Sequence, residues 1–140
     1  MPLPTPHQVT LVQTSWQSCL PIADTAANLF YDRLFTLDPS LRALFPNDLA
    51  EQKKKLLTML SAAVNGLNNV GTLVPVLQAL GRRHVAYRVE PRHYPTVGQA
   101  LLDTLALGLG PAFTPETREA WTVVYGVVAD TMISAAPAAA

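Results

Sequence analysis

The sequence has 140 residues, the size of one ordinary domain. Ten Lys and Arg residues balance ten Asp and Glu residues, so the formal net charge is zero, which argues against a basic nucleic-acid surface or a polybasic membrane anchor. No apolar run approaches the roughly 18 residues of a membrane-spanning helix, and the N-terminal segment does not resemble a signal peptide. We therefore predict a soluble, cytoplasmic single domain over residues 1–140, with residues 1–4 and 135–140 expected to be flexible.

The spacing of apolar residues is helical almost throughout and predicts an all-α domain. Thr5, Pro6 and Gln8 form a capping box that opens the first helix, which Pro21 interrupts. The second helix must stop before Pro39, because the residue ahead of a proline avoids helical backbone. The predicted helical segments of this half are residues 6–20, 23–37, a short turn at 39–45, and about 50–65.

The second half predicts three more helices. One runs over about residues 73–87, with Pro75 in its first turn, where a missing N–H costs nothing. The next carries apolar residues over 97–109 and ends at Gly110, and the last opens at Thr114 and ends before a frayed tail at 135–140. The many proline corners favour helices that cross at steep angles over a bundle of long parallel helices.

His84 lies on the most apolar face of its helix. At about 100° per residue, its stripe falls within an arc of roughly 80°; the stripe is Leu73, Leu77, Leu80, His84 and Tyr87. One interpretation is a core histidine whose imidazole donates a hydrogen bond to a backbone carbonyl. The other is a neutral imidazole that binds a metal or haem iron. With three histidines and only Cys19 as cysteine, a protein-only metal cage is hard to assemble, whereas haem needs just one histidine. Free Cys19 is expected to be buried.

Three other polar residues have weaker patterns. Gln52 lies about 40° from Leu56 on its helix, so its amide is either directed at a ligand or is an ordinary exposed first-turn glutamine. Tyr31 sits on the shoulder of its stripe, about 100° from Phe30, and Tyr94 is typical of structural packing at a helix start. His7 and His93 have no partner that the sequence indicates. No nucleophile elbow, phosphate loop or paired-carboxylate constellation occurs. The residues alone therefore indicate a helical pocket protein with one inward histidine.

Several short motifs in a fixed order are similar to those of a known family. They are Leu29-Phe30-Tyr31 with Leu34-Phe35, Leu44-Phe45 after Pro39, Gly81-Arg82-Arg83-His84, His93-Tyr94-Pro95-Thr96-Val97-Gly98, and Ala120-Trp121 with Val124-Tyr125-Gly126. The resemblance extends over residues 8–134. The chain thus resembles the single-domain bacterial globins, in the branch of the globin half of flavohaemoglobins and Vitreoscilla-type haemoglobin, close to the Hell's Gate-type globins of acidophilic methane oxidisers.

The resemblance implies a globin fold, about six to eight helices enclosing a pocket for haem b. It implies His84 as the proximal iron ligand, with the Leu80 carbonyl accepting its Nδ1–H. Tyr31 and Gln52 would be the distal pair that faces dioxygen, where a hydrogen bond to the ligand's partial negative charge is worth roughly 1.5–3 kcal/mol. The residues implied to line the haem are Phe45, Leu56, Leu80, Val89, Tyr94, Val97 and Tyr125.

The sequence departs from the flavohaemoglobin pattern in three ways. That family has a glutamate that contacts the proximal histidine and strengthens its electron donation to the iron. This chain has Ala136 at that position, so the strong electron donation of peroxidase-like chemistry is not expected. No flavin or nicotinamide domain is encoded in the 140 residues, so repeated redox cycles would need a separate reductase. Lys53 replaces the proline that follows the distal glutamine, which predicts a more regular helix there.

Three functions are compatible with the resemblance. The first is reversible, high-affinity dioxygen binding for storage, scavenging or delivery. The second is an enzyme activity, nitric oxide dioxygenation with an external reductase, and the partners in both cases are dioxygen, nitric oxide and other diatomic ligands. The third is a haem-free helical interaction domain, which predicts no haem absorption band after expression with adequate haem. Resemblance in fold does not choose between the first two.

Overall fold

The computed structural model describes residues 4–45, 47–86 and 92–139 of the chain, and these residues contain helices and turns only. In chain order the α-helices are α1 (Pro6–Cys19), α2 (Ala23–Leu37), α3 (Ala50–Asn65), α4 (Val70–Ala86), α5 (His93–Leu109) and α6 (Pro115–Ala139). Short 3₁₀ helices connect several of them: η1 (Leu20–Ile22), η2 (Pro39–Leu44), η3 (Gly66–Asn68) and η4 (Gly110–Ala112). The all-α prediction is confirmed.

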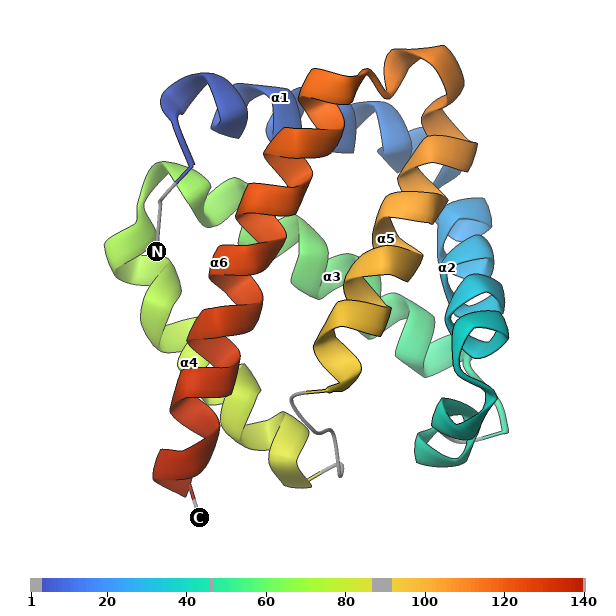
Figure 1. The fold of residues 1–140 in the computed structure, drawn as a ribbon, viewed down its shortest axis with the longest axis vertical. Helices are drawn as coiled ribbons and strands as arrows, with labels where there is room; N and C mark the ends of the chain where they lie inside the picture. Colours follow the sequence, from blue (N-terminus) through green and yellow to red (C-terminus); the bar gives the residue numbers. More distant parts are fainter. Residues whose placement is uncertain (1–3, 46, 87–91, 140) are drawn as a thin grey trace.

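The helices pair in two main groups that α1 bridges. α4 packs along α6 and α2 packs along α5, while α1 crosses near the ends of α5 and α6 (Figure 1). α3 runs behind α5 and α6 in this view and contacts α1 and α2. One hydrophobic core cluster contains side chains from every one of these helices. The described part of the chain contains no helix that is both long and apolar enough to cross a membrane.

Most predicted helix boundaries agree with the structure. The capping box of α1 is present, with Thr5 Oγ1 accepting from the Gln8 N–H and the Gln8 side chain accepting from the Thr5 N–H. α2 ends at Leu37 ahead of Pro39, α3 covers residues 50–65 as predicted, and Gly110 follows α5 with a φ of 56°, a backbone conformation that favours glycine. Local signals therefore located these ends correctly.

Two boundaries differ from the prediction, the start of α4 and the end of α6. α4 begins at Val70, three residues early, because Asn69 O accepts hydrogen bonds from Thr72 N and Leu73 N and so starts the helix there; Pro75 consequently lies inside it. α5 begins at His93, so Tyr94 lies at a helix start as predicted, and Pro95 falls in the first turn, a position that proline tolerates. α6 continues to Ala139 with Ala135 buried, so the predicted end before residue 135 is too early.

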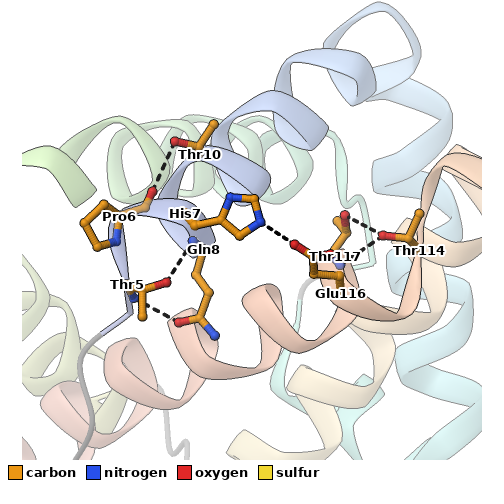
Figure 2. A network of polar contacts seen from close by, with 8 residues as sticks. All are labelled: Thr5, Pro6, His7, Gln8, Thr10, Thr114, Glu116 and Thr117. Carbon is orange, nitrogen blue, oxygen red and sulfur yellow. Dashed lines mark hydrogen bonds and ion pairs between the residues drawn. The ribbon is translucent and has the colours of Figure 1, made fainter.

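The N-terminal ends of α1 and α6 are joined by polar contacts that the sequence did not indicate. Figure 2 shows His7 Nε2 of α1 in hydrogen-bonding contact with Glu116 Oε1 of α6. Thr114 caps α6 in the same network, accepting from the Thr117 N–H at 3.2 Å. The His7 and Glu116 side chains are largely exposed, so their contact orients the two helix ends and adds little stability.

Two tryptophans anchor α1 in the core. Trp121 is 2% exposed, and its Nε1–H donates to Ser15 Oγ at 2.8 Å. Trp16 packs edge-on against Trp121 with ring centroids 6.2 Å apart, and its own Nε1–H donates to Ser61 Oγ at 3.0 Å. Cys19, at the end of the same helix, is buried as predicted. These contacts join α1 to α6 and α3.

Ser15→Ala should destabilise the fold by roughly 1–3 kcal/mol, because the Trp121 Nε1–H would lose its acceptor while staying buried. Ser18→Ala is the matched control on the same helix: Ser18 is exposed and donates only to the Thr14 carbonyl at 3.3 Å, so its removal should change stability by less than about 0.5 kcal/mol. Urea unfolding of both variants measures the difference. Equal midpoints would show that the Trp121–Ser15 hydrogen bond contributes nothing.

Candidate functional site

Tyr31 of α2 lies in a cluster of aromatic rings. Its side chain is only 3% exposed, so the shoulder position that the helical pattern assigned to it is part of the core. The Tyr31 ring meets Phe30 edge-on at 5.1 Å between centroids and Phe45 edge-on at 5.7 Å, and it is tilted against Phe35 at 6.0 Å. Phe45 follows η2 directly, so the cluster holds the η2 corner against α2. The surroundings of the Tyr31 hydroxyl are therefore poor in water.

The Tyr31 hydroxyl is directed toward the first turn of α3. It donates to the backbone carbonyl of Gln52 at 3.4 Å, a long and weak hydrogen bond. Burial raises the pKa of Tyr31 to about 12, although a hydrogen bond with Gln52 acts in the opposite direction. The hydroxyl therefore keeps its proton at neutral pH, and its weak internal bond leaves it able to donate to a better acceptor.

Gln52 and Leu56 lie one turn apart on α3. Gln52 is half-buried and adjoins Tyr31, so it is neither a fully exposed glutamine nor a core one. Leu56 contributes to a small apolar cavity of about 20 Å³, together with Phe30 and residues of α1 and α5. The structure thus brings Tyr31, Gln52 and Phe45 together, with Leu56 on the same side of α3 as Gln52.

Tyr94 and Tyr125 form a second group, between α5 and α6. The Tyr125 hydroxyl donates to the Tyr94 carbonyl at 2.7 Å. Burial raises the pKa of Tyr125, with Tyr94 adding to the effect, and burial likewise raises the pKa of Tyr94. A Cβ at Gly98 would lie 2.7 Å from the Tyr125 ring, so only glycine allows this approach. The contact fixes the start of α5 on α6, and nothing in the helical spacing had indicated it.

His84 belongs to the last part of α4, but its side chain lies outside the described part of the structure, and so does Val89. The backbone around His84 is positioned by a close helix crossing. A Cβ at Gly81 would lie 2.2 Å from the backbone oxygen of Met132, so α4 and α6 are in backbone contact three residues before His84. Leu80 and Val97 are half-buried and pack against the core.

The predicted lining residues share a degree of burial that the core residues do not. Each is large and apolar or aromatic, and each packs on the core yet stays half-exposed; those that the structure describes are Phe45, Leu56, Leu80, Tyr94, Val97 and Tyr125. They come from η2's end and from α3, α4, α5 and α6. Other half-buried apolar residues around the core, such as Val9, Leu11 and Leu102, share this degree of burial, so burial alone does not distinguish the lining residues.

Comparison with known proteins identifies the family. A family model described as Globin matches residues 28–132, a range that includes every residue of the predicted site. The chain belongs to the globin family. This globin is 37% identical over 114 residues to a flavohemoprotein of Bacillus subtilis and 33% identical over 114 residues to one of Rhodopirellula baltica. Each alignment covers 79% of this chain and 28% of the relative, so the globin spans under a third of both flavohemoproteins.

An animal globin is also similar to this chain, over most of the length of both proteins. Neuroglobin of Danio rerio is 34% identical over 136 residues, and the alignment covers 87% of this chain and 86% of neuroglobin. Together with the family match and the flavohemoproteins, it supports a haem globin that binds gas ligands. The bacterial type is supported by the two flavohemoproteins.

Family membership implies a haem cofactor, and the residues present fit that group. The half-buried apolar side chains offer a flat hydrophobic molecule the surface it needs. One hydroxyl donor, that of Tyr31, is held in aromatic surroundings with only a weak acceptor of its own. Apolar side chains on several elements, with the Tyr31 hydroxyl as a donor beside them, fit a macrocycle that brings its own four nitrogen ligands and a small polar ligand.

Proposed function

We propose that this globin binds dioxygen reversibly and with high affinity, in a pocket for haem b formed by η2 and helices α2–α6. His84 is proposed as the proximal ligand, with the Leu80 carbonyl accepting its Nδ1–H and so setting its tautomer. The remaining proposed haem contacts are Phe45, Leu56, Leu80, Val89, Tyr94, Val97 and Tyr125. When bound, the haem supplies the coordination position that a diatomic gas occupies.

The observation that carries this proposal is the buried Tyr31 hydroxyl beside Gln52. In dry, aromatic surroundings, a protonated hydroxyl and an amide N–H stabilise a ligand that carries partial negative charge more strongly than they would in water. The exchange of the long Tyr31–Gln52 hydrogen bond for a bond to the ligand costs little, because the bond given up is weak. Slow release of dioxygen is the expected consequence.

Repeated cycles of oxygenation and deoxygenation of the reduced protein test this proposal. We expect the absorption spectrum to return unchanged after each cycle, because the apolar lining limits the access of water and Tyr31, with its pKa raised to about 12, donates a hydrogen bond without giving up its proton. Complete oxidation on first exposure to oxygen would contradict reversible binding.

Nitric oxide dioxygenation is the second candidate, and the similarity to two bacterial flavohemoproteins favours it. In this reaction, dioxygen, nitric oxide and one electron yield nitrate, so an external reductase must supply an electron for each turnover. Sustained nitric oxide consumption with a flavin reductase present would support the enzyme. A single turnover with every donor would leave oxygen binding as the function.

Within the family, we place the protein in the flavohaemoglobin and Vitreoscilla branch and in the cytoplasm. The two bacterial relatives support the branch. The similarity to Hell's Gate-type globins stays a prediction from the sequence motifs.

A further inference from the structure

The corner between η2 and α3 is fastened by a single guanidinium group. Arg42 Nη1 donates to the Phe45 carbonyl at 3.3 Å, and its Nη2 donates to the Asn47 carbonyl at 2.9 Å. The Phe45 N–H in turn donates to the Arg42 carbonyl at 3.2 Å. One side chain therefore binds the backbone on both sides of the corner that leads into α3.

The same guanidinium covers one ring of the aromatic cluster. Its central carbon lies 5.3 Å from the centroid of the Phe35 ring, within the range of a cation–π contact. Phe35 packs edge-on against Phe45 at 5.6 Å, and both rings contact Tyr31. Arg42 touches neither the Tyr31 hydroxyl nor Gln52 in these contacts, but it fastens the groups that surround them.

We propose that Arg42 is the positioning residue of the distal pair. It holds the rings that orient Tyr31, and it holds the backbone that leads into α3, the helix that carries Gln52. This inference rests on the proposed role of Tyr31 and Gln52 as ligand donors. The geometry suits arginine and not lysine, because two carbonyls and a ring face require a planar fork with several N–H donors. Arg42 lies three residues before Phe45, where no helical or motif pattern distinguishes it.

The test compares Arg42→Ala and Arg42→Lys with Arg118→Ala. Arg118 is the matched control, because its guanidinium also lies over a phenylalanine ring, that of Phe113 at 6.0 Å, but at the start of α6 and away from Tyr31. We expect Arg42→Ala to release dioxygen about three- to tenfold faster, Arg42→Lys to show an intermediate rate, and Arg118→Ala to match the wild type.

Two further measurements separate positioning from general stability. In the full chain, amide hydrogen exchange over residues 45–52 should be faster in Arg42→Ala and unchanged in Arg118→Ala. The carbonyl stretch of bound carbon monoxide, which reports the electrostatic field of the distal donors, should shift in the direction of Tyr31→Phe. In a Tyr31→Phe/Gln52→Ala background, Arg42→Ala should add no further acceleration, because its effect passes through these two donors.

Each outcome decides a different claim. If Tyr31→Phe releases dioxygen faster but Arg42→Ala behaves as the wild type, Arg42 has no positioning role and the distal pair stands. If Arg42→Ala accelerates release to the same extent in the Tyr31→Phe/Gln52→Ala background as in the wild type, Arg42 acts independently of the pair and the proposal is wrong. If Tyr31→Phe has no effect, the distal assignment fails and the Arg42 proposal fails with it.

Discussion

His84→Ala should be unable to hold haem. His84 is the one proposed protein ligand of the cofactor iron, and no other side chain is proposed to replace it. Partners that merely orient a metal ligand are already worth about 10- to 100-fold in affinity, so loss of the ligand itself should exceed that. Purified His84→Ala should therefore lack the Soret absorption band of haem under expression conditions that saturate the wild type.

Two controls make this result specific. His7→Ala removes an exposed histidine at the start of α1 and should leave the haem content unchanged. In His84→Gly, imidazole added to the solution should restore the band, because it can occupy the space of the missing ring. A His84→Ala protein with a normal band and normal haem affinity would remove His84 from the site.

Gly81→Ala, which adds a single methyl group, should destabilise the protein strongly. The new Cβ would stand 2.2 Å from the Met132 backbone oxygen, and neither of the two backbones can yield as a flexible side chain would. Overpacking costs about 1–3 kcal/mol and occasionally more, and contact with backbone puts this site at about 3 kcal/mol or above. The strain would separate α4 from α6 three residues before His84, so haem retention should fall as well.

Gly126→Ala provides the matched comparison on α6. Its Cβ would meet nothing within 4 Å, so the higher helix propensity of alanine should stabilise the protein by roughly 0.5–1 kcal/mol. Urea-unfolding midpoints at equal haem content should move in opposite directions for the two variants. A Gly81→Ala midpoint equal to that of the wild type would mean that the two helices can separate without cost.

The sequence predicted the helices well where local chemistry decides their ends. Thr5 and Gln8 cap α1, Pro39 ends α2, and Gly110 follows α5, and each of these signals lies within a few residues of the end it determines. The predicted start of α4 is too late, because its first turn carries few apolar residues and depends on the hydrogen bonds that Asn69 O accepts.

The candidate site was predicted by resemblance more than by periodicity. Helical spacing placed Tyr31 only on a shoulder, yet packing by Phe30, Phe35 and Phe45 buries it. The Tyr125–Tyr94 hydrogen bond and the Arg42 contacts join residues through tertiary structure or corner geometry that a one-dimensional pattern does not contain.

The dioxygen dissociation rate of the reduced protein, measured by stopped-flow absorbance beside Tyr31→Phe and Gln52→Ala, tests the central claim most directly. Our account predicts slow release in the wild type and release about 10- to 150-fold faster when the Tyr31 donor is lost, with Gln52→Ala also faster. A fast wild-type rate that neither substitution changes would show that this pair does not contact the ligand.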